Sequence, residues 1–406
     1  MNQKLLLPVL ALTSFVLIVS LLYGRKRLPD PTTVYNQAPV AKKPDSLNKK
    51  QPKIQIVFAL DATGSMSGLI GAAKEKIWSI AGSLAQADPA PVIEMGLIFY
   101  RDRGDAFVTK QVALSTDIDE VYAKLMQITA DGGGDAPESV NQALYESITK
   151  FSWDSSSQTY KTVFLVGDCP PHMDYRNDIK YRASCSIDKQ KDIILNTILM
   201  GNDRQANRIW HEIANCSQGI FTQVNMNAND ITINTPYDSV IALLSDEVDD
   251  TRLYYGTESE KSLTTAKLSR SKSITGYSKA SVKAQRAEYN ASKAGKSSYY
   301  GDKEMLEEYR TNKNSLETLS KDELPDEMKN LSPAGKKIFI EEKIARRDSL
   351  NKELTKYTRL RQTFIEKDLS RRDSAEVDNS FSNQIYKNIQ KQTEKKNIHL
   401  REKTKY

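Results

Sequence analysis

The stretch that decides the fold is IVFALDATGSMSGL, residues 56–69. An apolar run ends in Asp61, and two hydroxyl residues, Thr63 and Ser65, follow at alternate positions. An apolar run without alternation is typical of a parallel strand that is covered on both faces. The carboxylate and the hydroxyls then stand at the C-terminal end of the strand, where open α/β sheets place their sites. By itself this turn fits a nucleophile, a cation site or a plain connection.

Residues 53–256 continue the pattern on both sides of this stretch. Further apolar runs read VIEMGLIFY, KTVFLVGD, DIILNTILMG and GIFTQV, and segments with helical spacing such as PESVNQALYESITKF and DRQANRIWHEIANC lie between them. Strands that alternate with helices indicate right-handed crossovers between parallel strands. The sequence therefore predicts an α/β domain with a doubly wound, mostly parallel sheet flanked by helices.

The N-terminal part has a different composition. Leu5–Tyr23 is 19 residues without a charge, which is nearly enough to span a bilayer as a helix. We expect a transmembrane anchor at 1–27, with a cleaved signal as the alternative. Residues 28–52 are rich in proline and polar side chains and are expected to form an extended linker.

The C-terminal part is basic. Thr257–Tyr406 carries 33 Lys and Arg against 23 Asp and Glu, whereas the rest of the chain carries 25 against 29. Residues 257–331 are polar and Ser-rich, and we expect a partly disordered segment there. Residues 332–406 are expected to be helical, with Ser332 and Pro333 at the start of a long helix. Its apolar stripe fits a coiled coil, a partner contact or packing on the core domain: Leu350, Leu354, Tyr357 and Phe364.

Three acidic loops fall at the predicted C-terminal edge of the sheet. Asp61 begins the first, the second runs from Asp131 through GGGDAPE, and Asp168 follows the strand KTVFLVG. These loops offer carboxylate and hydroxyl oxygens, which suit a hard divalent cation, Mg²⁺ before Ca²⁺ or Mn²⁺. The candidate ligands are Asp61, Thr63, Ser65, Asp135 and Asp168, and the candidate rim residues are Arg101, Asp102, Asp131, Glu138 and His172. Arg101 is expected to pair with Asp131 or Asp135, to contact a ligand or to form a surface ion pair.

Four motifs in order, DATGSM, YRD, GGGDAPE and VGDCPPH, resemble the von Willebrand factor A domain, in particular the subgroup with a Gly-Gly-Gly-Asp-x-Pro-Glu loop. The resemblance covers about residues 53–256 and implies a six-stranded sheet with a metal-ion-dependent adhesion site. Asp61, Thr63 and Ser65 then fill the first motif of that site, and Asp168 fills the last. At the position of the family's Thr this chain offers Asp135, whose added charge would weaken the attraction for an acidic ligand.

An enzymatic interpretation is also available. DATGS resembles the phosphorylation loop Asp-Lys-Thr-Gly-Thr of P-type ATPases and their haloacid-dehalogenase relatives, in which the Asp is phosphorylated. Here Ala62 replaces the Lys, and no Asp stands two residues after Asp61. We therefore expect no catalysis. Cys169, Cys185 and Cys216 fit either one disulfide and a free thiol or three unpaired thiols.

Taken together, the sequence predicts a non-enzymatic, metal-dependent protein-binding module for adhesion or assembly. It is expected at the cell envelope of a bacterium, anchored in the inner membrane and facing the periplasm, or secreted if the signal is cleaved. The cation would complete its shell with an acidic group of a protein partner, and no nucleic acid is expected. The alternatives are a scaffold that binds or oligomerises through its C-terminal helix, with a metal that only braces loops, and an Asp61-dependent phosphatase.

Overall fold

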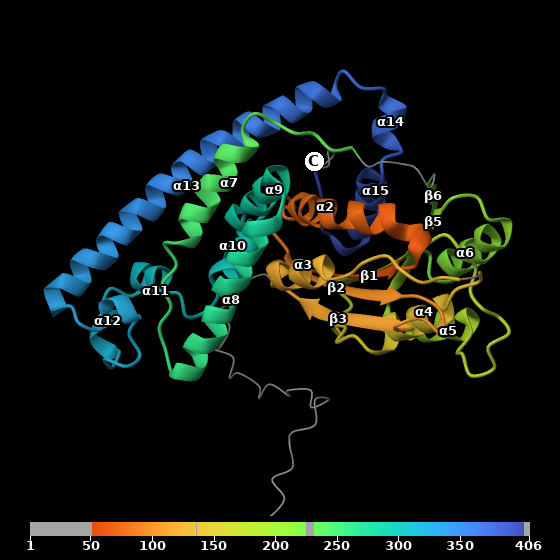
Figure 1. Ribbon diagram of the computed structural model, residues 1–406, viewed down its shortest axis with the longest axis horizontal. Coiled ribbons are helices and arrows are strands. Elements are labelled where there is room, and N and C mark those ends of the chain that lie inside the picture. Colours follow the sequence, from red (N-terminus) through yellow and green to blue (C-terminus); the bar gives the residue numbers. More distant parts are fainter. Residues whose placement is uncertain (1–50, 135, 225–230, 402–406) are drawn as a thin grey trace, which may run out of the picture. The chain divides into compact units, whose positions relative to one another are not determined.

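The fold contains a six-stranded sheet (Figure 1). The computed structural model describes residues 51–134, 136–224 and 231–401. The strand order is β3-β2-β1-β4-β5-β6, and all neighbours are parallel except the antiparallel pair β2–β3. This confirms the prediction of a mostly parallel, six-stranded sheet. The doubly wound topology stays a prediction. The strands are β1 (Lys53–Asp61), β2 (Val92–Tyr100), β3 (Thr109–Ser115), β4 (Tyr160–Gly167), β5 (Ile194–Met200) and β6 (Phe221–Val224).

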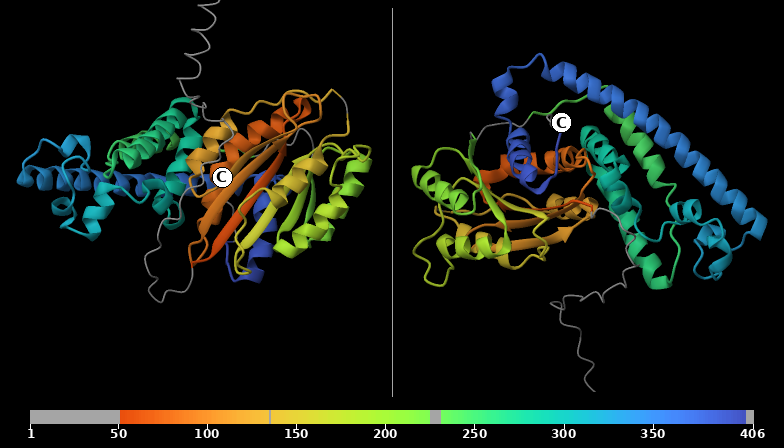
Figure 2. Two further views of the ribbon diagram at one scale, coloured as in Figure 1. Left: turned by 90° about the horizontal axis from the view of Figure 1, so that it is seen from below. Right: turned by 180° about the vertical axis from the view of Figure 1, so that it is seen from behind.

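Helices cover both faces of the sheet (Figures 1 and 2). Successive side chains of a strand point to opposite faces, and in β1 both sets are apolar. Phe58 and Leu60 pack in one core cluster, and Val57 and Ala59 pack in the other. One face is covered by α2 (Ser67–Leu84), α3 (Ile118–Met126) and α15 (Phe381–Thr393), and the other by α4 (Val140–Thr149), α5 (Tyr181–Lys191) and α6 (Arg204–Cys216).

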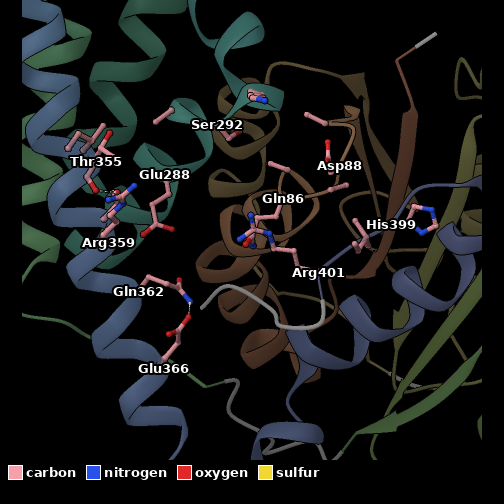
Figure 3. Close-up of a pocket in the computed structure, with 18 residues that line it drawn as sticks. Gln86, Asp88, Glu288, Ser292, Thr355, Arg359, Gln362, Glu366, His399 and Arg401 are labelled. Atoms are coloured by element: carbon pink, nitrogen blue, oxygen red, sulfur yellow. Dashed lines mark hydrogen bonds between the residues drawn. The ribbon is translucent and has the colours of Figure 1, made fainter. Parts of the chain in front are cut away.

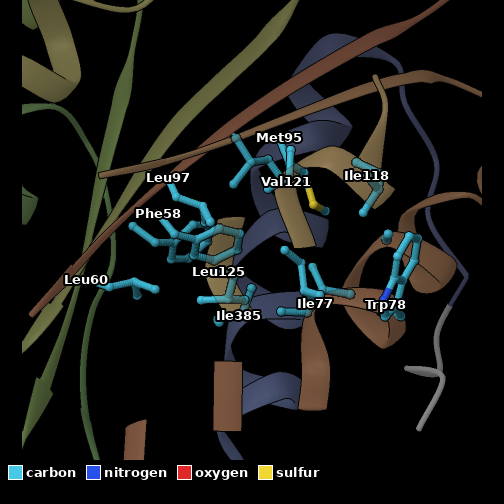
Figure 4. Packing of buried hydrophobic residues seen from close by; sticks show 14 of the residues in the cluster. Phe58, Leu60, Ile77, Trp78, Met95, Leu97, Ile118, Val121, Leu125 and Ile385 are labelled. Carbon is cyan, nitrogen blue, oxygen red and sulfur yellow. The ribbon is translucent and has the colours of Figure 1, made fainter. Parts of the chain in front are cut away.

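The helix α15 comes from the C-terminal end of the chain but belongs to the core of the sheet. Ile385 is fully buried and packs with Phe58, Leu60 and Leu125 in one cluster (Figure 4). Gln392 Oε1 accepts a hydrogen bond from Tyr160 Oη of β4 at 2.6 Å. The apolar face of the sheet therefore depends on a helix that lies outside the range 53–256 predicted for this domain.

The region from residue 238 to 378 is mostly helical. We expected a partly disordered segment at 257–331, but the structure has helices there. The first of them, α8, begins with a capping box formed by Thr257 and Glu260. The elements are α7 (Asp238–Asp249), α8 (Glu258–Tyr277), α9 (Ala280–Ala291), α10 (Lys293–Tyr300), α11 (Met305–Thr311), α12 (Ser315–Thr318), η2 (Asp326–Met328), α13 (Pro333–Leu369) and α14 (Ser374–Asp378); η1 (Gly64–Met66) and η3 (Glu394–Lys396) lie outside this region.

Buried ion pairs explain why a polar sequence folds here. Arg286 of α9 is 1% exposed, and its Nε lies 2.6 Å from Asp119 Oδ1 of α3 while its Nη1 lies 3.1 Å from Asp249 Oδ2 of α7. Two further arginines of α13, Arg347 and Arg361, are also fully buried against carboxylates. Composition predicts exposure from charge, but paired charges can be buried. We call Arg286, Arg347 and Arg361 with their carboxylates the buried arginine pairs.

The long helix α13 begins as predicted. The Ser332 side chain accepts a hydrogen bond from Gly335 N at 3.1 Å, and Pro333 is the first helical residue. The helix packs along α7 and α9 (Figure 1). Leu350 and Leu354 of the predicted stripe are buried, whereas Phe364 is 38% exposed.

Two predictions concern the export of the chain. The anchor at 1–27 and nearly all of the linker at 28–52 lie outside the described residues. Within the described part of the chain, no helix combines the length and the apolar character needed to cross a bilayer.

Cys185 and Cys216 form a disulfide between α5 and α6, and Cys169 is free and half-buried. Of the two cysteine interpretations, the structure has one disulfide and a free thiol.

Candidate functional site

Three neighbouring parallel strands end at the same edge of the sheet. Asp61 of β1 lies beside Tyr100 of β2, and Leu60 lies beside Val166 of β4. The loops that follow these strands contain the YRD motif, the DATGS turn and the VGD motif. The register thus brings three sequence-predicted motifs together.

The turn after β1 forms a chain of oxygen atoms from the core to the surface. Asp61 is fully buried, and its Oδ1 accepts hydrogen bonds from Thr63 N at 2.9 Å and Thr63 Oγ1 at 2.6 Å. Thr63 Oγ1 lies 3.3 Å from Ser65 Oγ, and Ser65 is exposed. The alternate positions 61, 63 and 65 therefore do place three oxygen-bearing side chains in one row.

The other carboxylate oxygen of Asp61 has no hydrogen-bond partner among the described residues. Burial raises the pKa of Asp61 to about 7; the Asp168 carboxylate adds to this, and the hydrogen bonds from Thr63 and the charge of Arg101 oppose it. A buried carboxylate without a counter-charge costs free energy unless it is protonated or meets a cation.

Two more carboxylates at this edge share this property. Glu138 Oε2 and Asp168 Oδ1 are both buried without a hydrogen-bond partner in the part of the chain that the structure describes. Burial raises the pKa of Glu138 to about 9, and the charges of Asp61, Asp102, Asp105 and Asp168 add to the effect. We call Asp61, Glu138 and Asp168 the unpaired carboxylates.

Glycines let two loops approach the unpaired carboxylates closely. Gly133 has φ +75°, and a Cβ there would lie 2.8 Å from Thr63 Cβ and 3.2 Å from Glu138 Oε1. A Cβ on Gly167 would lie 2.3 Å from Tyr100 Oη and 3.0 Å from Asp61 Oδ2. Larger residues at either position would displace the side chains that form the site.

Arg101 does not make the predicted ion pair with Asp131. Its Nε donates to the carbonyl oxygen of Ala62 at 3.0 Å, and its Nη2 donates to that of Thr129 at 2.7 Å. Asp131 is exposed and accepts from the backbone of Gly132. The buried guanidinium of Arg101 therefore bonds to the backbone of two loops. Asp135 lies outside the described residues.

Asp102 joins three loops beside the site. Its Oδ1 accepts from Ser139 Oγ at 2.8 Å, and its Oδ2 accepts from Tyr175 Oη at 2.6 Å. His172 Nε2 lies 3.3 Å from Asp102 Oδ2, and the His172 ring stacks on the Tyr175 ring with 3.9 Å between centroids. The sequence placed Asp102 and His172 at the rim but did not single out Ser139 or Tyr175. The aromatic and polar composition of residues 170–181 was the available signal.

The side-chain oxygen atoms at the sheet edge decide whether a cation can bind there. The described residues contain no group of three or more His, Cys, Asp and Glu side chains that would hold a metal ion. The predicted site differs in kind, since Thr63 and Ser65 contribute hydroxyl oxygens beside the carboxylates of Asp61 and Asp168. Asp61 Oδ2 and Asp168 Oδ1 are buried, unpaired oxygens of the type that Mg²⁺ binds. The residues present therefore fit a divalent cation.

A large cavity lies elsewhere, at the other end of α2 (Figure 3). It measures about 1090 Å³ and is bordered by α9, α13 and the residues around His399. Arg359 and Arg401 are exposed on its walls, and Gln362 donates to Glu366 at 3.0 Å. The cavity contains none of the sequence-predicted site residues, and we call it the α13 cleft.

Comparison with known proteins gives the following matches. Residues 55–235 match the family model of the von Willebrand factor A domain. A putative ariadne-like RING finger protein, R811, of Acanthamoeba polyphaga mimivirus is 27% identical over 123 residues, which are 30% of this chain and 12% of that protein. The chain thus spans a small part of this curated relative.

Two solved structures were compared as well. The SpRpn10 VWA domain has a TM-score of 0.33 and 10% identity over 44% of this chain and 89% of that chain. Proximal thread matrix protein 1 from the mussel byssus has a TM-score of 0.34 and 13% identity over 44% of this chain and 43% of that chain.

Proposed function

We propose that this chain is a non-enzymatic protein-binding module whose capture of a partner depends on a divalent cation, since residues 55–235 match the family model of the von Willebrand factor A domain. The partner would be a protein that presents an acidic group at the sheet edge. We further propose that the chain is held at a bacterial envelope through Leu5–Tyr23, or is secreted if that segment is removed.

One observation carries the cation part of the proposal. Asp61, Glu138 and Asp168 each hold a buried oxygen without a partner among the described residues. Leaving three such atoms at one edge of a sheet is costly for a fold. A divalent ion bound by Asp61 and Asp168 together with the hydroxyl oxygens of Thr63 and Ser65 would offset the mutual repulsion of these carboxylates, with Glu138 at the rim.

The roles of the residues follow from their positions. Asp61, Thr63 and Ser65 would bind the ion directly, and Asp168 and Asp135 would bind it directly or through water. When bound, the ion supplies an electrophilic position for an outside carboxylate. Thr63 holds Asp61 in orientation through two hydrogen bonds to Oδ1, which leaves Oδ2 for the ion. Ser65 is exposed, so it lies on the side from which a partner approaches.

The burial of Asp61 supports a non-enzymatic role. A phosphorylated aspartate must present an oxygen to its substrate, whereas the Asp61 side chain is fully buried. His172 Nδ1 lies 2.8 Å from Asp174 Oδ1, and its ring stacks on Tyr175, so its position is fixed by structural contacts. An assay of phosphate release from a generic phosphomonoester tests this, and release that disappears in Asp61→Asn would contradict the proposal.

The main experiment measures cation binding and capture together. Mg²⁺ affinity of the full chain is measured by calorimetry, and partners are collected from solubilised membranes with and without EDTA. We expect Asp61→Asn and Asp168→Asn to lose both activities. The matched control is Asp250→Asn, a carboxylate with 68% of its side chain exposed in a surface pair with Lys272. Unchanged Mg²⁺ affinity and capture in Asp61→Asn would refute the proposal.

A scaffold role has one observation in its favour. Leu360 and Phe364, four residues apart on α13, are 40% and 38% exposed. Truncating the C-terminal region is not a clean test, because it removes α15 from the core of the sheet. The double change Leu360→Ser with Phe364→Ser leaves that core intact. Capture that survives this change but not EDTA supports cation-dependent binding, and the reverse supports a scaffold.

A further inference from the structure

A second cavity lies inside the helical region, next to the α13 cleft. It measures about 210 Å³ and is formed by α7, α9, α10 and α13. Its inner wall is apolar and buried, with Val248, Ala287 and Leu354 at most 4% exposed. The rings of Tyr299 and Tyr300 complete this wall, with 4.8 Å between their centroids. The volume is below that of pockets for drug-sized ligands, so it suits a small molecule. We call it the tyrosine pocket.

An unpaired hydrogen-bond donor lines this pocket. The Asn290 side chain is nine-tenths buried, and its Nδ2 has no hydrogen-bond partner within the described part of the chain. An unsatisfied buried amide is unfavourable in a folded protein unless a ligand or water bonds to it. A bound acceptor oxygen would satisfy Asn290.

A cation stands at the mouth of the pocket. Lys296 of α10 is exposed, and its Nζ lies 3.1 Å from Glu307 Oε2 and 5.7 Å from the Tyr300 ring centroid. Glu307 also lies within 3.4 Å of Arg347 Nη1 and 3.7 Å of Arg310 Nε. Because Glu307 has these other cations, Lys296 can turn to a ligand without leaving Glu307 unpaired.

The pocket has no negative charge of its own. Among the residues that the structure describes, none of those lining it is an aspartate or a glutamate. The pocket combines an amide donor, an exposed ammonium group and an aromatic wall, and no carboxylate lines it. This combination favours an anion that has an apolar part. We infer that the tyrosine pocket binds a small carboxylate, with its oxygens on Asn290 and Lys296 and its apolar part against Tyr299 and Tyr300.

The α13 cleft provides the route of entry. The two cavities share Ala291, Leu354 and Thr355 in their linings, and Thr355 is exposed at the border between them (Figure 3). This site is separate from the sheet edge, so its occupation does not require the divalent cation.

The experiment uses benzoate as the probe and benzyl alcohol as a neutral probe of similar size. Binding to the full chain in EDTA is measured by saturation-transfer NMR and calorimetry. We expect benzoate to bind at least about tenfold more tightly than benzyl alcohol, since the alcohol lacks the charge that Lys296 attracts. Asn290→Leu is expected to weaken benzoate binding about tenfold, provided that its thermal unfolding midpoint shows a folded protein.

The matched control lies on the same helix. Lys296→Met is expected to weaken benzoate binding several-fold, whereas Lys293→Met, which changes a residue of the α13 cleft, is expected to leave it unchanged. Both side chains are exposed, so both variants should fold. Equal affinity for the two probes, equal effects of the two lysine variants, or no benzoate binding would each overturn the inference.

Discussion

The molecule buries carboxylates in two regions under opposite conditions. In the buried arginine pairs, Asp119 and Asp249 face the guanidinium of Arg286. Burial alone would raise the pKa of Asp119, but Arg286 overrides it and holds the pKa at about 2. At the sheet edge, burial raises the pKa of Asp61 to about 7; the hydrogen bonds from Thr63 and the charge of Arg101, whose guanidinium bonds to backbone carbonyls, only partly oppose this rise. The first region thus supplies a cation from within the chain for its buried carboxylates, whereas at the sheet edge a cation from outside stays our proposal.

The largest effect should come from breaking a buried arginine pair. Arg286→Met leaves Asp119 buried without its paired cation and leaves Asp249 with Arg252, and we expect it to lower the free energy of unfolding by about 3–5 kcal/mol. Urea unfolding measures this. Lys272→Met, which removes an exposed partner of Asp250, should change stability by less than about 1 kcal/mol. Equal effects of the two variants would show that burial does not distinguish these pairs.

A core substitution in α15 tests whether the C-terminal helix supports the sheet. Ile385→Ala creates a cavity beside Phe58 and Leu125 and should cost about 2–4 kcal/mol. Urea unfolding followed by tryptophan fluorescence detects it, because Trp78 belongs to the same cluster. Ile338→Ala, on an exposed position of α13, is the control. A transition in which α15 is lost without any change in the sheet would contradict this view.

Asp188 of α5 is another buried carboxylate, and the charge of Lys189 only partly offsets the cost of its burial. It is fully buried in α5, both its oxygens lack hydrogen-bond partners among the described residues, and burial raises its pKa to about 7. The Asp188 carboxyl therefore holds its proton more tightly in the folded chain than in the unfolded chain, where its pKa has the ordinary value of 3.8. Its contribution to stability is present below pH 4 and is lost as the pH rises to 7.

Asp188→Asn should thus stabilise the chain by about 2–3 kcal/mol at pH 8 and have little effect at pH 4. Urea unfolding at both pH values measures the difference. A gain of the same size at both pH values would mean that the charge of Asp188 is not the cause.

The smallest change in stability is expected for Asp61→Asn. Whether this variant stabilises or destabilises the chain should depend on the presence of a divalent cation. Without divalent ions, Asp61→Asn removes a buried charge but weakens the hydrogen bonds from Thr63, so a gain of about 1–2 kcal/mol is expected. With saturating Mg²⁺ the native chain gains ligand stabilisation that the variant lacks, so the order should reverse. Thermal unfolding in EDTA and in Mg²⁺ provides the comparison. A variant that remains the more stable protein in Mg²⁺ would count against a cation at Asp61.

Much of the fold was predictable because it depends on local patterns. The apolar strands, the start of α13 at Ser332 and the meeting of the DATGS and VGD loops follow from periodicity and from the register of parallel strands. The helices within 257–331 were not predicted, since their stability comes from side chains such as Arg286 that meet carboxylates distant in sequence. The structure does not have the expected pair of Arg101 with Asp131, since Arg101 donates to the backbone carbonyls of Ala62 and Thr129; its pairing with Asp135 stays a prediction.

The sequence alone was enough to predict which residue types meet at the end of β1. An apolar run is followed by Asp61, Thr63 and Ser65, and glycines stand where another loop comes close. Only the tertiary structure decided which charges are satisfied. Asp119 and Asp61 are both buried aspartates; the guanidinium of Arg286 bonds directly to Asp119 and lowers its pKa, whereas burial dominates at Asp61 and raises its pKa. Only the tertiary structure places α15 against β1, because its apolar face needs a surface that forms from residues more than three hundred positions earlier.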